Sequence, residues 1–130
     1  MFTKTRWLVR EAQLRFKYMT VKDCIFCKIV SGKIKCEPVL ETDEVLAIND
    51  INPIADIHIL IIPKRHIESV LTVKSVDGEM LIKLFEVAQR LVKEKNLSAF
   101  RLAFNGGKYQ HVPHLHMHLV AGRNVDLTKL

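Results

Sequence analysis

A run of alternating histidines constrains this chain more than any other feature of its sequence. The segment HVPHLHMHLV spans residues 111–120, and within it three histidines alternate with three apolar residues: His114, Leu115, His116, Met117, His118 and Leu119. Successive side chains of a β-strand point to opposite faces, so a strand places the three imidazoles on one face, about 7 Å apart. A helix would leave only the first and third histidines as neighbours. The alternation therefore predicts a strand whose apolar residues enter the core.

Three imidazoles on one sheet face are suited to two chemistries. Neutral imidazole is a common metal ligand, so the face could hold a metal ion. Alternatively, one imidazole could act as a nucleophile while its neighbours hold a charged substrate. A single buried histidine is commonly structural, but a purely structural face has no need of three titratable rings.

Composition sets the broad class. A chain of 130 residues with 48% apolar and 26% charged residues fits one globular domain, and it has no apolar run long enough to span a membrane. Three cysteines are too few for a secreted disulfide scaffold, which favours a reducing compartment, and we predict the cytoplasm. The net charge of +6 is uneven, because residues 1–22 carry +5 and the other 108 residues carry +1. The body therefore gives no electrostatic reason to bind nucleic acid.

Residues 1–22 form a basic N-terminal extension that admits several interpretations. The extension contains six basic residues and one acidic residue, with scattered apolar residues and no secretory h-region. Translation could start at Met19, which would leave most of the extension outside the native protein. It could also be a mitochondrial transit peptide, or a short basic helix for a membrane or nucleic acid.

Patterning predicts an α+β chain after the extension. Asp23 is suited to cap a short helix that ends at Gly32. A longer helix is expected over residues 77–95, where apolar residues recur at three- and four-residue steps, with Ser75 or Asp77 as its cap and Asn96 at its end. Strands are expected over residues 38–41, 45–48, 57–62 and 100–104, and in the histidine segment.

Cys24 and Cys27 have C-x-x-C spacing. Two thiolates so placed can bind one tetrahedral zinc ion if two further ligands come from elsewhere. A redox dithiol would favour a βαβ context, which the flanking sequence does not supply. The two cysteines could also be small core residues.

Taken together, four segments give a family resemblance. They are CIFCKIVSGKI (24–34), AINDINP (47–53), HILIIPKRHI (58–67) and HLHMHLV (114–120). In this order, over residues 23–123, they resemble the histidine triad (HIT) superfamily of nucleotide hydrolases and transferases, and in particular its Hint-like, bacterial-type members with a C-x-x-C motif.

The resemblance implies a fold and a chemistry for residues 23–130. The fold is α+β, with an antiparallel sheet of about five strands, one long and one short helix, and homodimeric assembly. The implied reaction is attack on the α-phosphate of a nucleoside phosphoramidate or dinucleoside polyphosphate. His116 would be the nucleophile and form a nucleotidyl-histidine, His118 would hold the phosphoryl oxygens, and His114 would orient its neighbours.

The resemblance also implies a zinc site and a nucleotide site. Structural Zn²⁺ would be bound by four residues, namely Cys24, Cys27, His66 and His114. No organic cofactor is expected. The substrate would be a purine nucleotide, with Asp50 on the ribose beside Ile51, and with further contacts from Asn105, Gln110 and His111. The Hint branch has serine where this chain has His111. His111 could therefore donate a proton to the leaving group, or it could have no part in the reaction. His58 has no assigned role.

Two other classes stay open. The protein could be a nucleotide-binding scaffold with little turnover, or a metalloenzyme whose triad histidines ligate the metal. A DNA-end-processing role has only the charge of the extension in its favour. The residues leave open the base, the leaving group and the final acceptor.

Overall fold

The computed structural model describes residues 23–123 and 125, and the predictions for residues 1–22 lie outside this part. Within it, regular elements follow one another in this order: α2 (Ile25–Val30), β1 (Leu40–Glu41), β2 (Val45–Asn49), β3 (Ile57–Pro63), the 3₁₀ turns η1 (Val70–Thr72) and η2 (Ser75–Asp77), α3 (Gly78–Glu94), β4 (Arg101–Phe104), η3 (Gly107–Tyr109) and β5 (Met117–Ala121). No helix of this part is long and apolar enough to cross a membrane.

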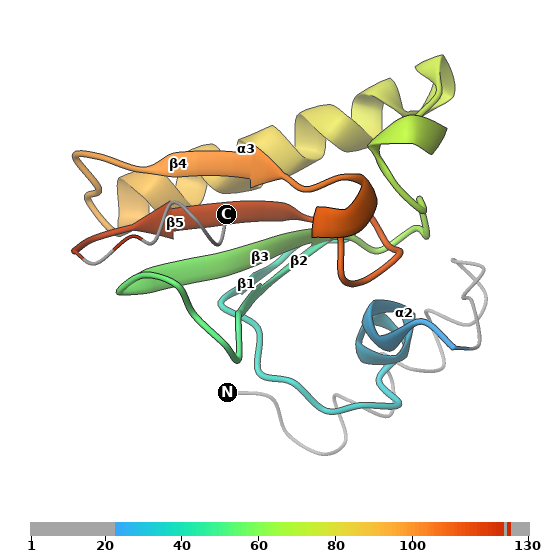
Figure 1. The fold of residues 1–130 in the computed structure, drawn as a ribbon, viewed down its shortest axis with the longest axis horizontal. Helices are drawn as coiled ribbons and strands as arrows, with labels where there is room; N and C mark the ends of the chain where they lie inside the picture. The colour runs from blue at the N-terminus through green and yellow to red at the C-terminus, as the bar shows by residue number, and fades with distance from the viewer. Residues whose placement is uncertain (1–22, 124, 126–130) are drawn as a thin grey trace.

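The strands form one antiparallel sheet in the order β1-β2-β3-β5-β4 (Figure 1). Strand β5 lies between β3 and β4, so it is central although it comes last in the chain. Its register places His118 opposite Leu60 of β3 and Ala103 of β4. The predicted α+β fold, with five antiparallel strands, one long helix and one short helix, is confirmed.

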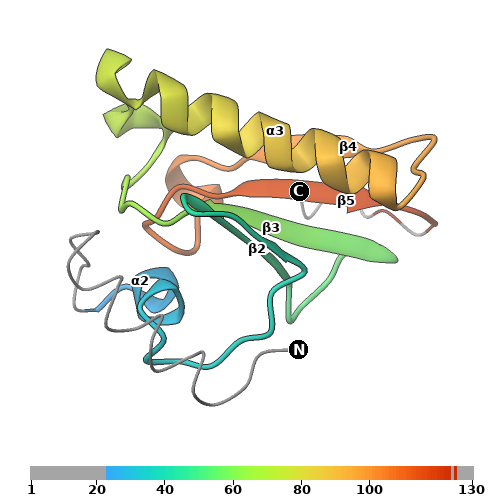
Figure 2. The same ribbon diagram turned by 180° about the vertical axis from the view of Figure 1, so that it is seen from behind.

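The two faces of the sheet are covered by different helices, as both ribbon views show (Figures 1 and 2). Helix α3 packs its buried stripe on the face that carries Ile59, Ile61, Met117 and Leu119. Helix α2 lies on the opposite face, against Leu46, Ile48, Leu60 and Ile62. The alternation in β5 therefore places Met117 and Leu119 in the core under α3 and turns His118 to the face shared with α2.

The helix ends differ from the predictions in detail. Helix α2 is capped by Cys24 rather than Asp23, because the Cys24 thiol accepts from the backbone N–H of Cys27 at 3.4 Å. Asp77 does precede α3, but its side chain accepts from the backbone N–H of Lys74 and makes no cap bond to α3. Asn96 ends α3 as predicted, with a left-handed φ of 52°.

The predicted histidine strand is shorter than its sequence pattern. Only His118 lies in β5, whereas His114 and His116 lie in the segment that leads into it. The N–H of Leu115 donates to the carbonyl of Ile67 at 2.6 Å, and that of His114 donates to Val112 at 2.8 Å. One local bond and one bond to the loop after β3 thus replace the ladder before Met117, and the second bond holds this segment against Ile67.

Candidate active site and metal centre

Four side chains gather at the junction of α2, the loop after β3 and the segment before β5. We call them the cysteine–histidine cluster: Cys24, Cys27, His66 and His114. Their ligand atoms all lie within 4.8 Å of one another, with Sγ of Cys24 3.3 Å from Nδ1 of His114 and Sγ of Cys27 3.3 Å from Nδ1 of His66. The structure thus brings together the four residues predicted to ligate zinc.

The donor set of this cluster fits a soft divalent metal. Nε2 of His114 donates to the carbonyl oxygen of Pro63 at 2.7 Å, so its Nδ1 carries a lone pair toward the two sulfurs. The hydrogen bond with the Cys27 side chain lowers the pKa of the Cys24 thiol to about 3, although burial opposes this shift. Two sulfurs and two imidazole nitrogens form the ligand set that Zn²⁺ takes in tetrahedral structural sites.

His116 lies between this cluster and His118. Its Nδ1 donates to the carbonyl oxygen of His114 at 2.7 Å, and Phe26 of α2 packs edge-on against its ring with centroids 5.0 Å apart. The bond at Nδ1 leaves the lone pair on Nε2, which has no hydrogen-bond partner within residues 23–123. Burial lowers the pKa of His116 below its ordinary value, which keeps the ring neutral and nucleophilic near pH 7.

His118 stands beside His116, with ring centroids 4.8 Å apart. Burial lowers the pKa of His118 to about 4, and repulsion from His116 and His58 adds to this effect. Nδ2 of Asn105, at the end of β4, lies 3.4 Å from its Nε2. The charge of His111 also contributes to the low pKa, which places that exposed loop histidine within electrostatic reach of the site.

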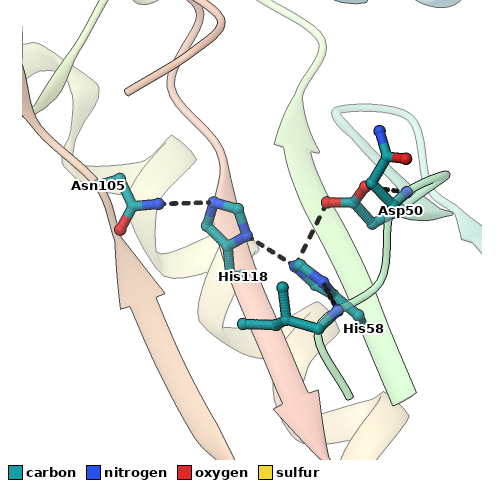
Figure 3. Close-up of polar contacts among 6 residues, drawn as sticks. Asp50, His58, Asn105 and His118 are labelled. Atoms are coloured by element: carbon teal, nitrogen blue, oxygen red, sulfur yellow. Dashed lines mark hydrogen bonds and ion pairs between the residues drawn. The ribbon is translucent and has the colours of Figure 1, made fainter. Parts of the chain in front are cut away.

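His58 is a site residue to which the sequence assigned no role. It is 6% exposed, and Figure 3 shows it between Asp50 and His118. Nδ1 of His58 accepts from the backbone N–H of Ile54 at 3.2 Å, so in the neutral ring the proton is on Nε2. That proton faces Nδ1 of His118 at 2.9 Å and Oδ2 of Asp50 at 3.4 Å. The sequence signal was present, since His58 is a polar residue inside an apolar strand.

The direction of these bonds fixes the tautomer of His118. Because His58 donates, Nδ1 of His118 accepts and its own proton lies on Nε2, next to the Nδ2 group of Asn105. The Nε2 side of His118 faces the amide of Asn105 (Figure 3), and a fixed N–H donor there suits an anionic oxygen that takes the place of this contact.

The same tautomer opposes a catalytic metal on this face. Asp50, His58 and His118 offer three atoms close enough to share an ion. However, ligation through Nε2 of His58 requires a proton on Nδ1, where the Ile54 N–H already points. Within the rest of the triad, Nδ1 of His114 faces the cysteines and Nδ1 of His116 is bonded to a carbonyl, which leaves Nε2 of His116 as the nitrogen with an available lone pair.

The predicted substrate contacts are placed unevenly. Asp50 is at the site, as described, and Ile51 beside it is 91% exposed. Nε2 of Gln110 donates to the carbonyls of Glu68 at 2.8 Å and Val112 at 3.0 Å, so its amide N–H groups are already bonded within the protein. In this arrangement Gln110 holds the loop before the triad.

Comparison with known proteins places this fold and site in one class of protein, which is named for its histidines. The family model described as "Scavenger mRNA decapping enzyme C-term binding" matches residues 23–127. A histidine triad protein from Clostridium difficile superposes with a TM-score of 0.78 at 39% identity, over 83% of this chain and 97% of that one. A HIT family hydrolase from Legionella pneumophila superposes with a TM-score of 0.77 at 38% identity, over 83% of this chain and all of that one.

Curated relatives agree with the structures. The chain is 36% identical over 104 residues to the adenosine 5'-monophosphoramidase HINT3 of Danio rerio, covering 77% of this chain and 65% of that protein. It is 37% identical over 103 residues to the adenosine 5'-monophosphoramidase HNT1 of Saccharomyces cerevisiae, covering 78% and 63%. The chain thus spans slightly less than two thirds of these two relatives. It belongs to the histidine triad (HIT) family.

Proposed function

We propose that this protein hydrolyses a purine nucleoside 5′-phosphoramidate, or a dinucleoside polyphosphate, through a nucleotidyl intermediate on His116. The observation that carries the proposal is the bond from Nδ1 of His116 to the carbonyl of His114, because it leaves the lone pair on Nε2 of a largely buried ring as the attacking atom. The names of HINT3 and HNT1 support the phosphoramidate as the first substrate to test.

The reaction has two balanced steps. For the phosphoramidate, Nε2 of His116 bonds to the α-phosphorus, the P–N bond to the leaving group breaks, and the departing amine takes a proton from His111. Water then gives a proton to His111 and bonds to phosphorus while the P–N bond to His116 breaks, which yields the nucleoside monophosphate and restores the imidazole. Splitting the displacement in this way lowers each barrier.

Nε2–H of His118 stabilises the charge that develops on the phosphoryl oxygens. The amide of Asn105, which contacts Nε2 of His118 at 3.4 Å, is assigned to the same end of the site as a substrate contact. Since the low pKa keeps His118 neutral, it acts as a hydrogen-bond donor at a fixed tautomer. His111, which is exposed on the loop before the triad, is assigned to the leaving group as its proton donor.

We propose Zn²⁺ as the occupant of the cysteine–histidine cluster. The metal would be held by Cys24, Cys27, His66 and His114, and when bound it supplies structural cross-linking rather than chemistry on the substrate. His114 contributes its ring to the cluster and its carbonyl to His116, so the same residue positions the nucleophile. No organic cofactor is needed for either step.

We propose a homodimer that forms through the edge strand β4. This strand ends the sheet and leaves one row of backbone groups unpaired by β5. Exposed apolar side chains accompany it, namely Phe100 and Leu102, and others lie on the outer surface of α3, namely Ile82 and Phe85. The proposal includes no membrane or nucleic-acid partner. We propose a cytoplasmic location, with residues 1–22 as an extension of the domain.

The decisive experiment measures turnover of adenosine 5′-phosphoramidate by the full wild-type chain and by His116→Ala, with folding of both checked by circular dichroism. The wild type is expected to release AMP and, after an acid quench, to carry an adenylate adduct that maps to His116. The His116→Ala variant is expected to fold and bind AMP without turnover. Equal turnover by both proteins would assign the nucleophile elsewhere, and binding without turnover by both would favour the scaffold alternative.

A further inference from the structure

Asp50, His58 and His118 form a row of polar contacts (Figure 3), with a hydrogen bond between the two histidines and an ion-pair contact of 3.4 Å between His58 and Asp50. We propose that this row couples ribose recognition at Asp50 to the proton position of His118, with His58 as the positioning residue between them. The inference rests on the proposed function and adds to it a determinant of substrate choice.

One N–H group of His58 bonds to His118 and also lies near the carboxylate of Asp50. Nε2–H of His58 lies 2.9 Å from Nδ1 of His118 and 3.4 Å from Oδ2 of Asp50. Nδ1 of His58 is occupied by the Ile54 N–H, so the ring has no second proton with which to satisfy both partners. The more strongly Asp50 attracts this proton, the less firmly His118 is held as the Nε2–H tautomer.

A second point concerns which carboxylate oxygen a substrate can reach. Oδ1 of Asp50 already accepts from the backbone N–H of Asn52 at 2.9 Å. Oδ2 is therefore the oxygen shared by His58 and by any incoming hydroxyl. The Asp50 side chain is 20% exposed, whereas that of His58 is 4% exposed, so a ligand can reach the carboxylate while the imidazole stays sealed from water.

The consequence is a link between the sugar and the reacting phosphate. A ribose hydroxyl that donates to Oδ2 competes for its lone pairs, and the proton of His58 is left to His118. His118 then presents Nε2–H to the phosphoryl oxygen. A nucleotide without the 2′ and 3′ hydroxyls leaves Asp50 in competition, so a fraction of His118 lacks the donor where charge develops.

The test compares adenosine 5′-phosphoramidate with its 2′,3′-dideoxy analogue on the full chain. We expect kcat to fall about tenfold for the dideoxy substrate, since one donor contributes up to about 10²–10³ in kcat. In Asp50→Ala the two substrates should have equal kcat. The matched variant Asp43→Ala, an exposed aspartate on the turn between β1 and β2, should keep the wild-type difference.

His58 variants separate a positioning role from a structural one. The amide of His58→Gln can accept from Ile54 and donate to His118, so it should retain the ribose dependence of kcat, whereas His58→Leu should lose it. A dideoxy substrate that raises KM alone, with kcat unchanged in the wild type, would overturn the coupling.

A second readout needs no turnover. Imidazole ¹⁵N spectra of the wild type should show His58 and His118 protonated at Nε2, and adenosine should raise the Nε2–H population of His118 while 2′,3′-dideoxyadenosine should not. Protonation of His58 at Nδ1, or no response of His118 to adenosine, would overturn the inference. If the wild type turns over neither phosphoramidate, the proposed function fails and these spectra still decide the coupling.

Discussion

Removing zinc should destabilise this protein more than any surface change, because the proposed site ties together distant parts of the chain. Cys24 and His114 are 90 residues apart in sequence, and their Sγ and Nδ1 atoms lie 3.3 Å apart. A ligand that binds only the folded state at about a thousand times its Kd stabilises that state by about 4 kcal/mol. At about 4 °C per kcal/mol for a domain of this size, the Tm should fall by about 16 °C on chelation.

Cys27→Ser tests this magnitude, since its sulfur meets both histidines of the cluster at 3.3 and 3.6 Å. Atomic emission should find no zinc in the variant. Its Tm, measured by calorimetry, should equal that of the chelated wild type and should not change when zinc is added. Cys36→Ser is the matched control, because Cys36 is half-buried and lies outside the cluster. It should bind one zinc ion and lose about 1 kcal/mol or less.

The metal should also affect turnover through one backbone atom. The carbonyl of His114 holds Nδ1 of His116, so loosening His114 misplaces the nucleophile. We expect kcat of the chelated protein to fall about tenfold to hundredfold, because a small misplacement of a reacting group can lower the rate by this much. A wild type that contains zinc but keeps both its Tm and its kcat on chelation would refute the reasoning.

Three further predictions follow from single contacts. If His111 protonates the leaving group, His111→Ala should slow amine release far more than release of p-nitrophenolate, and equal effects in steady-state assays would exclude that role. Because burial lowers the folded pKa of His118 to about 4, against about 6.5 when unfolded, the unfolded chain binds more protons between these values. Stability should therefore fall as the pH drops from about 6.5 to about 4, and urea titrations should show a shallower fall in His118→Gln. Phe85→Glu should give a monomer by sedimentation while Lys83→Glu, on the other side of α3, stays dimeric; two dimers would move the interface away from α3.

Local patterns predicted the elements well and their ends less well. Alternation of Leu115, Met117 and Leu119 marked a core-facing segment, and all three are buried under α3. The same alternation predicted too long a strand. A sequence pattern does not show that the N–H of Leu115 donates to the carbonyl of Ile67 instead of to a neighbouring strand. Similarly, Asp23 has the better intrinsic preference for a cap, but the Cys24 thiol is in place to accept the bond.

The sequence by itself determined the residue types of the site, because the chemistry of thiols, imidazoles and carboxylates travels with short motifs. It named the four residues that the structure brings together as a possible metal site, and its assignment of the nucleophile to the histidine segment stays a prediction. What only the tertiary structure decided was the direction of the hydrogen bonds. His58 and His118 are 60 residues apart, and their contact exists because β3 and β5 pair in one register. A tautomer depends on which backbone groups surround a ring, and those groups arrive from distant parts of the chain.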